Sequence, residues 1–245
     1  VYHMLEETIA VAMRMLDNVV DLNFYPIPEA ANSNLKHRPV GLGVMGWHDV
    51  LYRLNLPFDS MEAVETADRL QEFVSYHAIL NSSKLAQEKG TYQSYKGLKW
   101  DRGLLPFDTI ALLEQERGME IDVPKTMTMD WTPVREHIQK FGMRNSNTMA
   151  IAPTATISNI SGCIPTIEPI YKNIYVKSNQ TGEFTVVNTY LVEALREIQM
   201  WTQDMVNKIK TFDGSVQDIQ EIPADIRARF KEVFELGSEW IIKHA

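Results

Sequence analysis

The residue types best suited to binding chemistry gather in one stretch of the chain, from Met143 to Tyr175. A short apolar run, Met149 to Ala152, is stopped by Pro153, and Thr154-Ala155-Thr156-Ile157-Ser158 then places a hydroxyl at every second position. Small side chains let an anion reach backbone N–H groups, hydroxyls add donors, and a helix beginning within 157–160 would direct its positive end to the same point. The pattern therefore predicts a strand followed by an anion-binding loop.

The same residues have a second interpretation. A Pro-Thr-x-Thr sequence also suits an ordinary strand exit, where a threonine caps the following helix without binding any ligand. From the residues alone, a structural role and a phosphate-binding role both remain open.

Three glycines, Gly41, Gly43 and Gly46, satisfy the spacing Gly-x-Gly-x-x-Gly. A dinucleotide site would need a buried strand before them and an acidic residue at the end of a following strand. Polar residues and Pro39 precede them instead, and a helical pattern follows. We therefore expect the glycines to allow close backbone packing and a tight entry into a helix over Trp47–Leu54, and we do not expect a nicotinamide dehydrogenase.

Cys163 and Glu168 could together suggest a thiyl radical and a neighbouring acid. The surrounding sequence, Ser-Gly-Cys-Ile-Pro, is instead typical of a turn that contains one small apolar residue, so we expect a structural role for Cys163. His77 lies in a helical pattern without a second metal-ligand type at i+3 or i+4, which favours a core or boundary histidine over a metal ligand.

The elements that must position these residues are mainly helices. Apolar spacings of three and four predict helices over Tyr2–Phe24, Trp47–Leu54, Ser60–Lys89, Thr109–Gly118, Trp131–Phe141 and Leu191–Ile209, followed by a final helical pair from Pro223 to Ala245. Alternating residues predict a hairpin of Ile174–Lys177 and Phe184–Val187, turned at Asn179–Gly182. The polar segments Glu29–Arg38 and Asp122–Thr128 are predicted to be loops.

Composition narrows the functional classes. The 245 residues are 44% apolar and carry a formal net charge of -8, with no basic stripe for a nucleic acid, so an anionic substrate needs a local binding device. No apolar run reaches the roughly 18 residues of a membrane span, and no signal sequence opens the chain, so we expect a cytoplasmic protein. The single cysteine excludes an internal disulfide. The chain starts without Met and ends on an unterminated helical pattern, so we expect a piece of something longer.

Several separate motifs occur in the order found in a known family: Asn145-Ser146, the run from Pro153 to Gly162, Ile167-Glu168-Pro169, and Asn173 to Lys177. Together they resemble the large subunit of ribonucleotide reductase. The resemblance implies part of a ten-stranded α/β barrel, built of two half-barrels around a finger loop. It also implies that residues 1–245 are a single unit, the C-terminal portion of the catalytic barrel, incomplete at both ends.

The resemblance places the substrate diphosphate against Pro153, Thr154, Ala155, Thr156 and Ile157. Alanine at 155 favours class I, because the adenosylcobalamin-dependent class usually has glycine there. The radical cysteine of the family, its Glu and Asn, the radical-relay tyrosines and the other redox cysteines lie outside the matched segment. We therefore expect no catalytic residue and no metal site in this chain.

The resemblance also implies the partners of an assembled ribonucleoside-diphosphate reductase. These are the remaining parts of the large subunit, a small β subunit with a metal-radical centre, the ribonucleoside diphosphate, nucleotide effectors bound outside this segment, and a dithiol reductant of the thioredoxin or glutaredoxin type. This segment would bind no cofactor and would be inactive alone. The alternative is a non-catalytic nucleotide-binding or assembly module derived from the same barrel.

Overall fold

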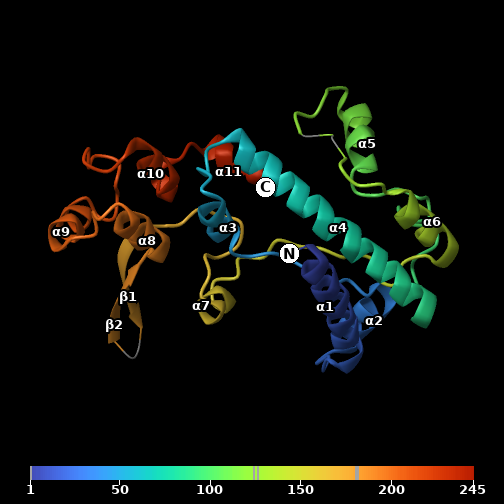
Figure 1. Cartoon of the computed structure of the whole chain (residues 1–245). Coiled ribbons are helices and arrows are strands. Elements are labelled where there is room, and N and C mark those ends of the chain that lie inside the picture. Colours follow the sequence, from blue (N-terminus) through green and yellow to red (C-terminus); the bar gives the residue numbers. More distant parts are fainter. Residues whose placement is uncertain (1, 124, 126, 180–181) are drawn as a thin grey trace. The chain divides into compact units, whose positions relative to one another are not determined.

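A computed structural model describes residues 2–123, 125, 127–179 and 182–245 (Figure 1). The contacts divide the chain into two compact units. Unit 1 comprises Val1–Gly43 and Asp68–Ala152, and unit 2 comprises Val44–Ala67 and Pro153–Ala245. The chain passes from one unit to the other at three places, and one of them, between Ala67 and Asp68, lies within a long helix, α4 (Met61–Lys89).

Unit 1 is built on helices that the apolar spacing predicts. Besides the larger part of α4, they are α1 (Tyr2–Leu22), α5 (Asp108–Arg117) and α6 (Thr132–Phe141). Ser60 caps the beginning of α4, because its hydroxyl accepts a hydrogen bond from the Ala63 N–H at 3.2 Å. Of the predicted loop Asp122–Thr128, residues 124 and 126 lie outside the described residues, and the others form no helix or strand.

The prediction of a loop over Glu29–Arg38 is wrong, because this segment forms helix α2 (Pro28–His37). The segment is polar and has no apolar stripe, but residues typical of helix ends stand at both of its ends. Proline stands at the first turn with Glu29 beside it, and Lys36 and His37 occupy the last turn, where cations favour the helix dipole. Arg38 then ends the helix in a left-handed conformation, with φ 47°.

The predicted strand Met149–Ala152 is reduced to one parallel bridge between Met149 and Leu42. Backbone hydrogen bonds join Leu42 N to Thr148 O at 2.9 Å and Ala150 N to Leu42 O at 3.1 Å. The two glycines beside Leu42 permit this approach, since a Cβ on Gly41 would lie 2.9 Å from that of Ala150 and one on Gly43 would overlap the Ala150 carbonyl. Their predicted packing role is confirmed.

A fully buried carboxylate, that of Asp17 on α1, ties the parts of unit 1 together. It accepts hydrogen bonds from Arg38 Nε at 2.9 Å, from Asn145 Nδ2 at 3.1 Å and from Arg144 Nε at 3.3 Å. Arg38 also donates two hydrogen bonds to Asp21, and these bonds lower the pKa of the Asp21 carboxyl. One charge therefore fixes α1, the end of α2 and the segment before the Leu42–Met149 bridge.

Unit 2 holds short elements connected by long irregular segments. They are α3 (Trp47–Leu54), α7 (Ile157–Ser161), β1 (Ile174–Asn179), β2 (Gly182–Val187), α8 (Thr189–Glu197), α9 (Gln203–Thr211), α10 (Ala224–Arg229), the 3-10 turn Val233–Glu235 and α11 (Ser238–His244). The predicted α3 and the predicted hairpin are confirmed, and Ile174 pairs with Val187 across the antiparallel strands. Residues 180 and 181 of the predicted turn lie outside the described residues.

The single helix predicted over Leu191–Ile209 is wrong, because α8 and α9 are separate helices. Gln199 takes a left-handed conformation with φ 60° after the end of α8. The Thr202 hydroxyl then accepts from the Met205 N–H at 3.2 Å and opens α9 as an N-cap. Apolar spacing runs on across the break because both helices bury residues in one core, which includes Leu195 and Ile209.

No helix among the described residues is long and apolar enough to cross a membrane.

Replacing Arg38 by Met should destabilise unit 1 by about 3–5 kcal/mol, because the buried Asp17 would lose its main charge partner. Urea unfolding measures this loss. The matched control is Arg14→Met, which breaks an exposed ion pair between α1 and Glu88 and should leave stability nearly unchanged. Equal effects of the two substitutions would contradict the central role of Asp17.

Candidate functional site

The predicted anion loop, Pro153–Ile157, lies in unit 2 and leads directly into α7. Thr154 has φ 50°, a left-handed conformation that is rare for a β-branched residue. Its hydroxyl accepts a hydrogen bond from the Thr166 N–H at 2.7 Å, and its carbonyl accepts from Ser158 N at 3.0 Å. These two contacts hold the loop in a fixed turn, and the predicted helix start within 157–160 is confirmed.

The backbone N–H groups of the loop are not used within the described part of the chain. Those of Thr154, Ala155, Thr156 and Ile157 donate to no group there. The Thr156 side chain makes no capping bond to α7, and all of these residues except Thr154 are exposed. The loop therefore presents four free donors at the beginning of a helix, the arrangement that binds anions elsewhere.

Helix α3 holds the segment that follows the loop. The Asp49 carboxylate accepts from Ile164 N at 2.7 Å, while Gly46 N donates to Ile164 O at 2.8 Å. Gly46 has φ 77°, and a Cβ there would lie 3.3 Å from the Cβ of Cys163. The third glycine of the Gly-x-Gly-x-x-Gly sequence thus gives the tight helix entry that was predicted for it.

His48 on α3 anchors the segment at a second point. Its Nδ1 accepts a hydrogen bond from the Ile170 N–H at 2.9 Å, so the proton of the neutral ring lies on Nε2. The ring is fully buried and stacks on Tyr52 with 4.2 Å between centroids. Burial lowers the pKa of His48 to about 3, which keeps the ring neutral and its Nδ1 free to accept.

A cavity of about 410 Å³ opens beside α7 in unit 2. Its polar walls include Asp49, Ser158, Cys163, Glu168, Lys172 and Tyr190. The Ser158 hydroxyl is buried and makes no hydrogen bond within the described residues. None of the five predicted loop residues lines this cavity, which begins at the residue after them. Sequence reasoning missed Asp49 as a neighbour of the loop, because its partner Ile164 lies 115 positions away.

The structure brings Cys163 and Glu168 to this same cavity. Cys163 is half-buried, and its N–H donates to Ser158 O at 3.0 Å, closing the turn after α7. Burial and the nearby Asp49 raise the pKa of the thiol, so it stays protonated at neutral pH. These contacts agree with a structural role for Cys163.

A buried polar cluster fixes the base of the hairpin that walls the cavity. Asn173 N donates to the Glu232 carboxylate at 2.7 Å, and the Asn188 side chain donates to Asn173 Oδ1 at 2.9 Å. Asn188 N also donates to Asn173 O at 2.7 Å. Burial raises the pKa of Glu232 to about 7 despite the hydrogen bond from Asn173.

No group of three or more His, Cys, Asp or Glu side chains that could hold a metal ion occurs among the described residues.

Comparison with known proteins decides the family. The sequence profile of the ribonucleotide reductase barrel domain matches residues 2–245. The chain belongs to the ribonucleotide reductase barrel-domain family. It is 57% identical over 240 residues to the ribonucleoside-diphosphate reductase subunit alpha of Chlamydia pneumoniae, covering 98% of this chain and 23% of the relative. It is 39% identical over 245 residues to the ribonucleoside-diphosphate reductase large chain of Schizosaccharomyces pombe. This match covers 100% of this chain and 29% of the relative.

Membership of this family confirms the predicted resemblance to the large subunit of ribonucleotide reductase. It also confirms the predicted fold class, a helix-rich part of an α/β barrel with one hairpin. The chain spans about a quarter of the length of these relatives. That residues 1–245 form a single unit of the barrel, and that Pro153–Ile157 bind the substrate, stay predictions.

Removing the Thr154 hydroxyl tests the loop geometry. Thr154→Ala should lower stability by about 1–3 kcal/mol, because the buried N–H of Thr166 would lose its acceptor. Thr154→Ser keeps the acceptor and relieves the crowding of a β-branched side chain at positive φ, so its stability should equal or exceed that of the natural chain. Urea unfolding curves in which Ala and Ser behave alike would contradict this account.

Glu232 should make the stability of unit 2 depend on pH. Its pKa is about 7 in the folded chain and 4.5 in the unfolded one, so its stabilising contribution is complete below pH 4.5 and is lost as the pH rises through 7. Glu232→Gln keeps an acceptor for Asn173 N but does not titrate. The urea midpoint of the natural chain should therefore fall relative to that of Glu232→Gln between pH 4.5 and 8.

The control for this comparison is Glu197→Gln, which changes an exposed carboxyl at the end of α8. His48 titrates in the opposite sense, adding stability as the pH rises from 3 to 6.5, but it is common to all three proteins and cancels from the differences. Parallel curves for the natural chain and Glu232→Gln would rule out the raised pKa.

Proposed function

We propose that this chain is the part of a ribonucleoside-diphosphate reductase large subunit that holds the substrate diphosphate. The observation that carries the proposal is the loop Pro153–Ile157, whose four successive N–H groups, from Thr154 to Ile157, donate to nothing within the described residues. Family membership supplies the class of substrate, because the relatives named above are ribonucleoside-diphosphate reductases.

The side chains of the loop add to the donors of its backbone. The Thr154 hydroxyl accepts from Thr166 N and so keeps its own proton to donate to a phosphate oxygen. The Thr156 hydroxyl is exposed and makes no hydrogen bond in the described residues. Pro153 and Ala155 are small enough to leave the backbone open. Two hydroxyls and four amides would thus face the diphosphate without any Lys or Arg in the loop.

The chemistry itself needs the rest of the enzyme. Reduction replaces the 2′-hydroxyl of the ribonucleoside diphosphate by hydrogen, while two thiols become a disulfide and the oxygen leaves as water. This chain has one cysteine, Cys163, and cannot form that disulfide within itself. The proposed partners are therefore the remaining parts of the large subunit, a small β subunit with a metal-radical centre and a thioredoxin- or glutaredoxin-type reductant, all in the cytoplasm.

Reconstitution tests the proposal. The chain is mixed with the upstream and downstream parts of the large subunit, the small subunit and a dithiol, and deoxyribonucleoside diphosphate is measured. Activity should appear only in the complete mixture. Thr154→Glu/Thr156→Glu should lower kcat/KM about a hundredfold or more, because two carboxylates would repel the diphosphate and block its donors.

The matched control is Thr211→Glu/Gln220→Glu, which adds the same charge at exposed positions of unit 2 away from the loop. It should retain most of the activity. An inactive complete mixture, with the other parts shown to be competent, would favour the alternative of a non-catalytic nucleotide-binding or assembly module. Equal losses in the two double variants would show that the loop is not the phosphate site.

A further inference from the structure

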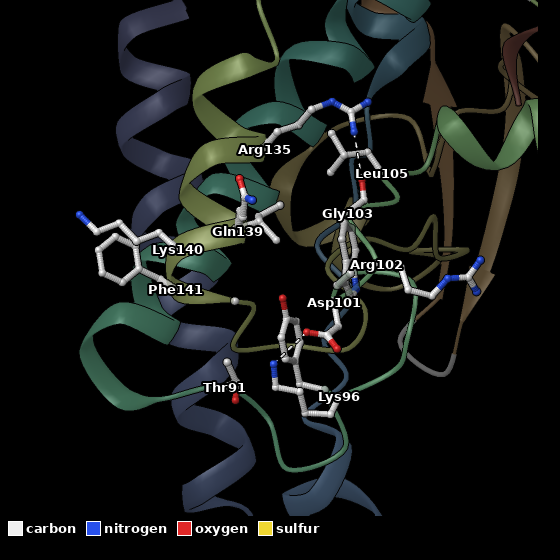
Figure 2. A pocket seen from close by; sticks show the side chains of 14 residues that line it. Thr91, Lys96, Asp101, Arg102, Gly103, Leu105, Arg135, Gln139, Lys140 and Phe141 are labelled. Atoms are coloured by element: carbon white, nitrogen blue, oxygen red, sulfur yellow. Dashed lines mark hydrogen bonds and ion pairs between the residues drawn. The ribbon is translucent and has the colours of Figure 1, made fainter.

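Unit 1 contains a second cavity, of about 490 Å³, that the proposed reductase role does not use. It lies between the last turns of α6 and the irregular segment 91–105 (Figure 2). Its volume falls within the range of about 300–1,000 Å³ that is typical of small-molecule sites.

Positive charge is concentrated around this cavity. Four cationic side chains line it, those of Lys96, Arg102, Arg135 and Lys140, against one carboxylate, that of Asp101. This local excess contrasts with the net charge of -8 on the whole chain. An anion would therefore be attracted to this region of unit 1 against the overall charge of the chain.

Two of these cations already have carboxylate partners and two do not. Lys96 binds Asp101 at 3.0 Å, and Arg135 binds Asp108 at 2.7 Å. Arg102 and Lys140 have no carboxylate partner among the described residues. In Figure 2 their side chains extend away from each other, Lys140 from the end of α6 and Arg102 from the irregular segment, and both residues are exposed.

Aromatic rings form much of the remaining wall. Trp100 is fixed by a hydrogen bond from its indole N–H to Ser146 O at 2.9 Å, and Tyr95 is buried with its ring edge-on to Tyr92. The Tyr95 hydroxyl has no hydrogen bond within the described residues, which leaves a donor for a ligand. Lys140 already lies 5.0 Å from the centroid of the Phe141 ring.

Close packing at Gly142 fixes the floor of this cavity. The residue has φ 74°, and a Cβ there would overlap the Thr91 methyl and lie 3.2 Å from the Tyr95 ring. Tyr95 therefore packs directly on backbone, and its position depends on a glycine that ends α6. The cavity is part of the packed structure of unit 1 and does not depend on flexible surface side chains alone.

We propose that this cavity binds a phosphorylated ligand with a flat ring, of about the size of a nucleotide. The ring would lie against Trp100 and Tyr95, and the phosphates would bind cationic side chains of the lining, those of Arg102, Lys140 and Lys96. A flat ring gains by stacking on aromatic side chains, and phosphate gains charge-assisted hydrogen bonds from Arg and Lys. The site is separate from the loop Pro153–Ile157, which belongs to unit 2.

The experiment titrates the chain with ADP, adenosine and pyrophosphate while following tryptophan fluorescence. ADP should give a saturable change that is absent in Trp100→Phe, and it should bind about tenfold or more tightly than either fragment. Arg102→Gln/Lys140→Gln should weaken ADP binding about tenfold. The matched control, Lys36→Gln/Lys99→Gln, removes the same charge from exposed residues of unit 1 that do not line the cavity, and it should bind ADP normally.

The loop variant Thr154→Glu/Thr156→Glu separates this site from the proposed substrate site, and the Trp100 signal should persist in it unchanged. Loss of the signal in that variant would assign it to unit 2 and overturn the proposal. So would equal weakening in both glutamine pairs, a signal that survives Trp100→Phe, or no saturable change up to millimolar ADP.

Discussion

Unit 1 depends on one buried carboxylate, that of Asp17. A carboxylate removed from water is tolerated only when charged or polar partners satisfy it. Arg38, Arg144 and Asn145 provide these partners from two segments more than a hundred residues apart in the chain. All three side chains must reach the Asp17 carboxylate at the same time. The end of α2 and the segment leading to Met149 are therefore held in one arrangement, and this arrangement sets the pairing of Leu42 with Met149.

Unit 2 meets a related requirement with two side-chain acceptors on one helix. The segment 163–170 has no regular structure, so its backbone needs hydrogen-bond partners from side chains. Asp49 and His48, neighbours on α3, accept from Ile164 and Ile170 and leave the preceding loop free of such bonds. Exposed N–H groups can bind water, so the four free amides of the loop cost little by themselves. They remain available for an anion because α3 satisfies the segment after them.

Sequence reasoning succeeded where the information is local and failed where it is not. Apolar periodicity and caps identified α1, α3, α4 and the hairpin, since those signals lie within the element itself. It missed α2, whose face is polar, and the break between α8 and α9, where one apolar stripe continues across two helices. It found the loop Pro153–Ile157 but not Asp49 or the two cavities, because these arise from contacts between residues far apart in the chain.

The segment beginning at Met149 shows that strand formation depends on both the local sequence and the number of neighbouring strands. Its sequence, Met-Ala-Ile-Ala, favours a buried strand, yet only one residue forms a bridge, to Leu42. A barrel gives every strand a neighbour on both sides, whereas the described residues give this segment one. Parallel pairing is weak when a strand has one partner, since half of its backbone groups stay unpaired. With one neighbour among the described residues, the segment 149–152 therefore forms a single bridge and no regular strand.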